Sequence, residues 1–385
     1  MHRNRRLIGL AAVIAAMATT LSVGTAAAAG SPAVGHVYVN NNSSGHNTIA
    51  AFDRHADGSL TPIAGSPFNA GGVGTGAPYG SAGGLQRSTD GRYLLATDPA
   101  SDQISVLRIK PNGGLQPVET EGSRGSSPVS IAVHGSLVYV ANTGAGGSNY
   151  TGFRLNAGGH LSHIGGSTFD LPDDALPGHV LISPDGRRLI GTRVGPNAGP
   201  SYLDGFSIGS DGRLTPAPGS PFAAQRIGPF GSSFSPTHGN QLFVSNAHDG
   251  ANAGSVSVYD VAADGSLNAI AGSPFADLQT APCWVAMSPD GHALFAVNTA
   301  VPSISRYAVA ADGTLTLAGS TAFSSPTGLR PFDAQVSPDG DHLYVVDAGV
   351  AKVSVFAIEG TSLTELGGSP FAIPGGAAPF GMVVD

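Results

Sequence analysis

A unit of about 50 residues recurs seven times along the chain, and this repetition limits the possible folds more than any other feature. In its clearest copy, residues 229–275, short apolar and alternating runs follow one another, separated by turn residues. Val256, Ser257 and Val258 alternate apolar and polar side chains, as is typical of a half-buried strand. An Asp-Gly pair at 264–265 provides the backbone angles of a hairpin turn. Each unit therefore predicts an antiparallel sheet of about four strands.

The register of the copies is regular. A proline opens the first extended run of every copy but the first, at intervals of 48 to 53 residues: Pro78, Pro128, Pro177, Pro229, Pro282, Pro331 and, near the end of the chain, Pro379. A repeat of this length with four strands in each unit is the signature of a β-propeller. Seven copies predict an all-β protein with seven blades. The first copy lacks its opening run, so we expect residues 376–385 to complete blade one and close the ring, which removes both open sheet edges.

Two short motifs recur at fixed places in the unit. We interpret both as structural elements of the fold and not as parts of a catalytic site. Gly-Ser-Pro-Phe ends four copies, where it is expected to place a phenylalanine between blades and to stop strand pairing at the proline. Ser-Pro-Asp-Gly forms a tight turn in three copies. We interpret its aspartates, Asp185, Asp290 and Asp339, as turn formers.

The first 29 residues have the pattern of a secretion signal. Arg3, Arg5 and Arg6 precede a short apolar run at 7–21, and three alanines at 27–29 form a small-residue cleavage site. An uncleaved membrane anchor is the alternative, but the apolar run is short for a span. We therefore expect an exported protein, secreted or associated with the cell envelope, with residues 30–385 as one domain. The sequence contains no second membrane segment.

Charge and cysteine content exclude several classes of partner. Cleavage would remove three of the 18 basic residues and none of the 26 acidic ones, which changes the net charge from −8 to −11. Nucleic acids and anionic membranes are therefore unfavourable partners. The single cysteine, Cys283, cannot form an internal disulfide. We expect a monomer that uses no cofactor. We also expect no metal site, because His248-Asp249 is the nearest approach to a pair of metal ligands and further ligands are missing.

The mature chain resembles the lactonase-like seven-bladed propellers, the family of bacterial 6-phosphogluconolactonases and fungal carboxymuconate cyclases. Asp-Gly-Ser-Leu turns followed by Gly-Ser-Pro-Phe carry this resemblance, together with Ser-Pro-Asp-Gly followed by strands such as residues 343–346. Surface propellers with Tyr-Val-x-Asn strands are also similar, as in residues 138–142. These are signatures of the fold and carry little information about activity. The resemblance implies a lactone hydrolase, and export favours an unphosphorylated lactone because phosphorylated sugar lactones are cytosolic.

The resemblance also implies polar residues at the starts of the inner strands. His179 matches a His-rich run in blade four, although one place out of register, and Asp333 matches the acid that opens blade seven. The acidic place after the next strand of blade four is taken by Arg193. The Arg-His pair that opens blade five is replaced by Phe230-Gly231. Arg330 stands beside the place of a missing arginine in blade seven.

The third residue of each inner run is expected to line the central channel. These residues are Gly80, Ser130, His179, Gly231, Trp284, Asp333 and Gly381. His179 and Asp333 are our candidates for a general base and its orienting partner, with Arg193 or Arg330 stabilising the oxyanion. Trp284 offers a stacking face for a sugar or an apolar ligand.

Ser130, Phe230 and Phe332 are further candidates for substrate contacts at the same mouth. Two alternatives stay open. Trp284 and Cys283 could simply plug a narrow channel, and the protein could be a non-catalytic propeller that binds a carbohydrate, a peptide or a surface protein.

Overall fold

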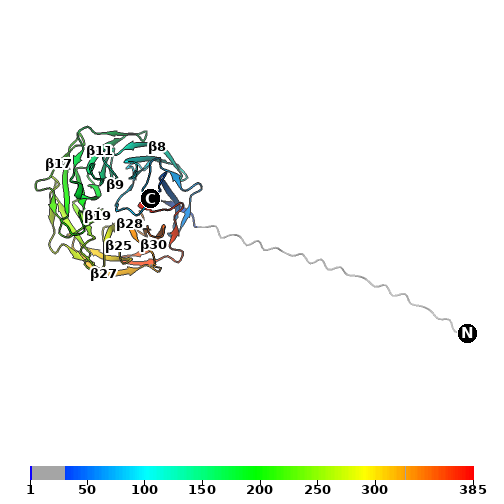
Figure 1. Cartoon of the computed structure of the whole chain (residues 1–385). Helices are drawn as coiled ribbons and strands as arrows, with labels where there is room; N and C mark the ends of the chain where they lie inside the picture. Colours follow the sequence, from blue (N-terminus) through cyan, green and yellow to red (C-terminus); the bar gives the residue numbers. More distant parts are fainter. Residues whose placement is uncertain (2–30, 326) are drawn as a thin grey trace. The chain divides into compact units, whose positions relative to one another are not determined.

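Seven antiparallel sheets stand around a common axis in the computed structural model, which describes residues 1, 31–325 and 327–385 (Figure 1). The predicted signal segment falls on residues 2–30 and lies outside the described residues. Residues 32–385 form one compact unit. In this unit the strand order confirms the predicted all-β, seven-bladed propeller.

The first three blades follow the chain in order. Blade one contains β1 (Ala33–Asn40), β2 (Thr48–His55), β3 (Leu60–Pro62), β4 (Phe68–Asn69) and β33 (Phe380–Val384). Blade two contains β5 (Leu85–Arg87), β6 (Tyr93–Asp98), β7 (Gln103–Ile109) and β8 (Leu115–Gly122). Blade three contains β9 (Pro128–His134), β10 (Leu137–Asn142), β11 (Asn149–Leu155), β12 (Leu161–His163) and β13 (Phe169–Asp170).

The next four blades repeat the plan, after a short 3-10 helix, η1 (Asp173–Ala175). Blade four contains β14 (Pro177–Ile182), β15 (Arg188–Arg193), β16 (Tyr202–Ile208), β17 (Leu214–Pro216) and β18 (Phe222–Ala223). Blade five contains β19 (Pro229–Phe234), β20 (Gln241–Asn246), β21 (Ser255–Val261), β22 (Leu267–Ala269) and β23 (Phe275–Ala276). Blade six contains β24 (Pro282–Met287), β25 (Ala293–Asn298), β26 (Ser303–Val309) and β27 (Leu315–Ala322). Blade seven contains β28 (Pro331–Val336), β29 (His342–Asp347), β30 (Lys352–Glu359), β31 (Ser362–Glu365) and β32 (Phe371–Ala372).

The C-terminal strand closes the ring as predicted. β33 pairs antiparallel with β1, with Tyr38 opposite Val383 and Val39 opposite Met382. The inner edge of blade seven holds β33 from the other side, because the Gln335 amide donates to the carbonyl of Met382 and accepts from the N–H of Val384. The first blade is thus built from both ends of the described unit.

Blade two departs from the prediction at its inner strand. Pro78 does not open a strand; the inner strand is the three-residue β5, which begins at Leu85. Residues 78–84 instead run inward to the axis, where the N–H of Ala82 donates to the carbonyl of Gly178 in blade four. Ala82 packs in the same apolar cluster as Phe230 and Trp284. The extra residues of the second copy therefore help to fill the channel.

The recurring motifs are scaffold, as predicted. In the Ser-Pro-Asp-Gly turns, Asp185, Asp290 and Asp339 each accept a hydrogen bond from the serine of the motif and one from a backbone N–H two residues on. In Gly-Ser-Pro-Phe the serine hydroxyl accepts a backbone N–H of the third strand, as Ser66 does from Ala51. Both motifs satisfy backbone groups where regular pairing ends.

A polar clasp joins the second and third strands of every blade at one face of the ring. The last residue of each second strand is bonded to a side chain at or near the start of the third. The pairs are Asn40–Asn47, Asp98–Ser105, Asn142–Asn149, Arg193–Asp204, Asn246–Ser257, Asn298–Ser305 and Asp347–Ser354. Blade four alone uses an ion pair in this position.

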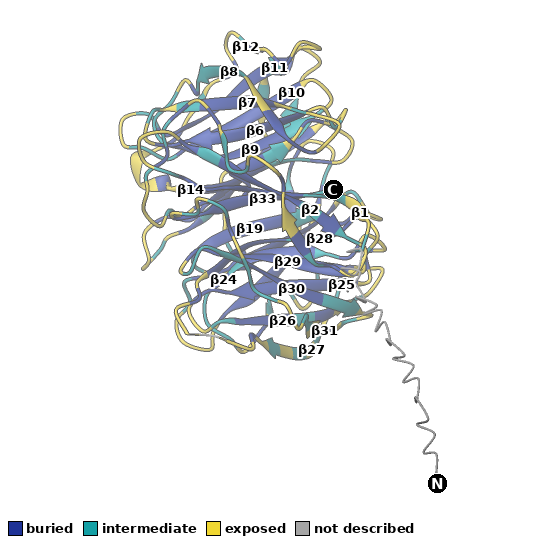
Figure 2. Ribbon diagram, turned by 90° about the vertical axis from the view of Figure 1, so that its right-hand side faces the viewer, coloured by how far each residue is buried: buried dark blue, intermediate teal, exposed yellow. Residues whose placement is uncertain are grey.

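Apolar contacts between neighbouring sheets form the core. Figure 2 shows the strands mostly buried and the connecting turns exposed. Tyrosine and phenylalanine side chains in the second and third strands fill the spaces between blades, among them Tyr139, Tyr307, Phe52 and Phe243, all fully buried. The described part of the chain contains no helix with the length and apolar character that a membrane span requires.

Candidate functional site at the central channel

The inner strands surround a channel that is closed at its waist and hollowed at each end. We call the face at which the inner strands begin the upper face and the one at which they end the lower face. Trp284 and Phe230 are 7% and 8% exposed and belong to one apolar cluster with Ala82, which blocks the axis. The hollows at the two ends share no lining residue, so we describe them as two separate cups.

The upper cup has a volume of about 330 Å³. Its walls come from the first residues of the inner strands and from connecting segments between strands: Tyr79, Phe230, His248, Cys283, Thr299, Arg330 and Phe332. The aromatic rings form an apolar wall on which a flat ring can pack. The predicted pair Phe230 and Phe332 is thus brought together with Arg330.

Arg330 is the cation of the upper cup. Its side chain is exposed, its guanidinium carbon lies 5.9 Å from the centre of the Phe332 ring, and it makes no ion pair or side-chain hydrogen bond with the described residues. An arginine without an acidic partner can donate to a carbonyl or carboxylate oxygen of a ligand.

His248 was not among the predicted site residues, because its loop gave no ligand pattern. The structure places its imidazole in the wall of the upper cup, where the ring makes no side-chain hydrogen bond with the described residues. Burial lowers the pKa of His248 below its usual 6.5, while the neighbouring Asp249 opposes this effect more weakly. The imidazole is therefore neutral at pH 7 and can accept a proton.

Cys283 lies in the same cup as a free thiol. Burial raises the pKa of this thiol to about 11. Because the thiolate and not the thiol is the nucleophile, Cys283 does not carry covalent chemistry at neutral pH. It contributes a small apolar surface beside Thr299 instead.

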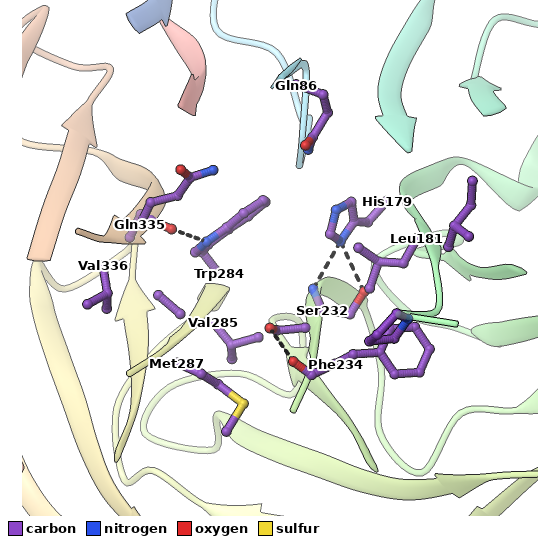
Figure 3. A pocket seen from close by; sticks show the side chains of 15 residues that line it. Gln86, His179, Leu181, Ser232, Phe234, Trp284, Val285, Met287, Gln335 and Val336 are labelled. Carbon is purple, nitrogen blue, oxygen red and sulfur yellow. Dashed lines mark hydrogen bonds between the residues drawn. The ribbon is translucent and has the colours of Figure 1, made fainter. Parts of the chain in front are cut away.

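The lower cup has a volume of about 350 Å³ and lies among the last residues of the inner strands. Figure 3 shows His179, Ser232, Trp284, Gln86 and Gln335 around it. His179 accepts a hydrogen bond at Nδ1 from the N–H of Ser232, 3.1 Å away, and its ring centre lies 5.2 Å from that of Trp284. The predicted residues His179 and Trp284 are thus neighbours, but they line the lower cup and not the upper one.

Asp333 lines neither cup and is 2% exposed. No hydrogen bond joins it to His179, and neither of its carboxylate oxygens is hydrogen-bonded among the described residues. Burial raises its pKa from 3.8 to about 7, with a smaller opposing effect from the nearby Gly381 amide. The structure therefore does not join His179 and Asp333 into a hydrogen-bonded pair.

Arg193 and Ser130 also lie away from both cups. Arg193 is held by two hydrogen bonds of 2.6 Å to the carboxylate of Asp204, which also accepts from the hydroxyl of Tyr150 in blade three. Ser130 is fully buried and accepts the N–H of Val180. Ser130 joins blades three and four, and Arg193 holds Asp204 within blade four, so both residues belong to the scaffold.

A β-bulge accompanies the separation of the second residues of the inner strands from the third. The pairing of the first and second strands is irregular just after the opening proline in blades four to seven, for example between Pro177 and His179. Bulges redirect side chains. The second residues, such as Phe230 and Phe332, point to the upper cup, whereas the third residues His179 and Trp284 reach the lower one.

Comparison with known proteins assigns the fold to a family. Residues 16–173 and 234–383 match the family described as "Lactonase, 7-bladed beta-propeller". The chain belongs to this family. The unmatched stretch between the two segments, residues 174–233, includes all of blade four and most of β19. No curated protein matches the sequence.

Solved structures of low identity share this lactonase-family fold. A candidate 6-phosphogluconolactonase from Bacteroides uniformis is 21% identical, with a TM-score of 0.71 over 90% of this chain and 98% of its own. A protein from Lactobacillus plantarum is 19% identical, with a TM-score of 0.70 over 91% and 99%. The periplasmic gluconolactonase PpgL of Pseudomonas aeruginosa is 18% identical, with a TM-score of 0.67 over 91% and 98%. These likenesses extend over almost the whole length of each relative and concern the fold.

The carboxyl of Asp333 should reduce stability at neutral pH. Between pH 4 and pH 7 the unfolded chain loses this proton while the folded protein keeps it, so the free energy of unfolding falls as the pH rises. We expect Asp333→Asn to raise stability at pH 8 by as much as about 4 kcal/mol and to have little effect at pH 4.

Chemical denaturation at the two pH values measures this. Asp290→Asn is the control of opposite sign, because hydrogen bonds from Ser288 and His292 lower the pKa of that turn carboxyl. An Asp333→Asn variant that is less stable at pH 8 would show that the carboxylate is held by favourable contacts.

Proposed function

We propose that this lactonase-family propeller hydrolyses a small unphosphorylated lactone in the upper cup. One observation carries the proposal: a single cavity with aromatic walls brings together an arginine and a neutral histidine whose side chains have no hydrogen-bond or ion-pair partner among the described residues. Such a pair supplies the two functions that opening a cyclic ester needs, a proton acceptor and an oxyanion donor.

His248 and Arg330 supply the proton transfers and the oxyanion stabilisation of the hydrolysis. His248 takes a proton from a water molecule whose oxygen attacks the lactone carbonyl carbon, and Arg330 donates hydrogen bonds to the oxyanion that forms. The carbonyl is restored as the ring C–O bond breaks, and the protonated His248 gives its proton to the leaving alkoxide. The product is the open-chain hydroxy acid. Tyr79, Phe230 and Phe332 pack against the ring and hold its carbonyl toward Arg330.

The charge of the cup favours an unphosphorylated substrate. A phosphate monoester carries about −1.5 to −2 charges at pH 7. Arg330 is the one lysine or arginine among the described residues that line the cup, and the chain has a net charge of −8. Export through the amino-terminal segment, which we propose on its sequence, would also separate the protein from phosphorylated sugar lactones. The gluconolactonase of Pseudomonas aeruginosa that shares the fold is periplasmic.

The decisive experiment follows acid release in a pH-stat from gluconolactone, 6-phosphogluconolactone and aliphatic lactones, corrected for spontaneous hydrolysis. We expect His248→Asn and Arg330→Gln each to lower kcat/KM by about 10² or more, because each removes one of the groups that act in the transition state. His179→Asn and Asp333→Asn are the matched controls from the channel and should keep most of the activity.

Other outcomes have clear meanings. Activity lost in the His179 and Asp333 variants and kept in the other two would move catalysis to the waist of the channel. Turnover of none of these lactones would favour a non-catalytic propeller, a reading that the aromatic closure of the waist also supports. In that case the upper cup would be a binding site for a carbohydrate, a peptide or a surface protein.

A further inference from the structure

The lower cup contains a hydrogen-bond donor that nothing in the upper-cup reaction uses. The N–H of Ser232 donates to Nδ1 of His179, so the neutral imidazole carries its proton on Nε2. Burial lowers the pKa of His179 to about 3, which keeps the ring neutral. The residue is 2% exposed, and Nε2 makes no hydrogen bond with the described residues. Nε2 is therefore a free donor at the surface of the cup.

The free edge of His179 faces the cup. In Figure 3 the ring is turned so that its bonded nitrogen faces Ser232 and its other edge faces the space between Trp284 and Gln86. Gly83 keeps this edge clear, because a Cβ at that position would lie 3.0 Å from Nε2. The donor is therefore aimed at a space that a ligand can reach from the lower face.

Trp284 gives the cup a fixed aromatic face. Its indole N–H donates to the carbonyl of Ala334 at 2.6 Å, which holds the ring in one orientation beside His179. Gln335 is also fixed, because both ends of its amide are bonded to β33. The amide of Gln86, in contrast, makes no hydrogen bond with the described residues and can both donate and accept.

The lining of the lower cup carries no charge. None of its described lining residues is Asp, Glu, Lys or Arg, and His179 is neutral. Ser232 and Ser233 add neutral hydroxyls to the lining, and Val285, Met287 and Phe234 are among its apolar residues. An ion would lose its hydration there without gaining an opposite charge. The site therefore selects against charged ligands.

We propose that the lower cup is a second binding site, specific for a small uncharged oxygen-containing ring such as a pyranose or a lactone. The ring packs one C–H face on Trp284 and accepts the Nε2–H of His179 at a carbonyl or hydroxyl oxygen, and Gln86 bonds a neighbouring oxygen. The volume of about 350 Å³ accommodates one such ring. The site shares no side chain with the upper cup, so it does not depend on the proposed lactonase activity.

Trp284 is the single tryptophan of the chain, which provides a direct probe. Its fluorescence and the NMR signal of its indole N–H are followed during titration with methyl α-glucopyranoside, δ-valerolactone or sodium gluconate. We expect a saturable change with at least one of the two neutral rings and none with gluconate, an open-chain anion. A response to the glucoside alone, or to the lactone alone, assigns the ring type.

Variants locate the binding. Gln86→Ala should raise the Kd at least tenfold, and because Gln86 is partly exposed its loss should leave the fold intact. His179→Gln should weaken binding similarly, with circular dichroism checking that the sheet is retained. Arg330→Gln, in the upper cup, should leave the Kd unchanged. The proposal is overturned if neither neutral ring binds, if gluconate binds equally well, or if Arg330→Gln and not Gln86→Ala removes the response.

Discussion

A chain shortened by residues 376–385 should lose its cooperative thermal transition and become insoluble. The deletion removes β33, whose Met382 and Val383 are 2% and 5% exposed, and uncovers the inner edge of β1. It also leaves the Gln335 amide without its two partners on β33. An open, apolar strand edge promotes pairing between chains. The free energy of unfolding should fall by more than the roughly 0.5 to 3 kcal/mol that is typical of a single substitution.

Calorimetry and size-exclusion chromatography of the shortened chain measure this result. Asp385→Ala is the matched control, because it keeps the strand and removes only the side-chain contacts of Asp385 with His36 and Arg87. That variant should melt within a few degrees of the parent protein. If the shortened chain melted as the parent does, β33 would not be needed to close the ring, and blade one would be stable with its edge open.

The fold could be predicted from the sequence because each repeat carries its own strand and turn signals. The intervals between the opening prolines indicated seven blades, and the apolar tail at Met382 to Val384 indicated the closing strand. The one departure, the inner strand of blade two, lies where extra glycine-rich residues precede the turn. A loop and a strand edge are hard to tell apart in such a stretch, because glycine accepts both backbone conformations.

The site could be predicted only in part. The sequence identified the inner strands and thereby Phe230, Phe332 and Arg330 at one mouth. It could not show the bulge after the opening proline, which depends on the pairing of two strands and sends His179 and Trp284 to the other end. His248 lies outside the strands altogether. The length of its loop, residues 247–254, against four residues at 299–302 in blade six, was the available signal for a functional insertion.

Arg193 is the predicted catalytic residue whose position differs most from the expectation, and its replacement should act on stability. In the polar clasp of blade four its guanidinium meets the carboxylate of Asp204 through two hydrogen bonds, and Asp204 is 1% exposed. Removing one partner of a buried ion pair leaves the other charge without compensation, typically at 3 to 5 kcal/mol. We expect Arg193→Ala to lower the free energy of unfolding by about that amount.

A double variant tests whether the stability loss of Arg193→Ala comes from the uncompensated charge of Asp204. Arg193→Met with Asp204→Leu removes both charges together, and well-packed apolar replacements of a buried pair are often neutral or stabilising. The double variant should therefore recover much of the stability that Arg193→Ala loses, as measured by urea denaturation. Arg330→Gln is the exposed control, with a change of no more than about 0.5 kcal/mol.

Activity then distinguishes the two parts that Arg193 can play. If the arginine only compensates the charge of Asp204 within blade four, the folded double variant hydrolyses lactones with the kcat of the parent protein. An oxyanion role would give the opposite pattern, with stability recovered and kcat still lost. The ion pair favours the first result, because a guanidinium already held by both oxygens of Asp204 would have to break those bonds before it could turn to a substrate.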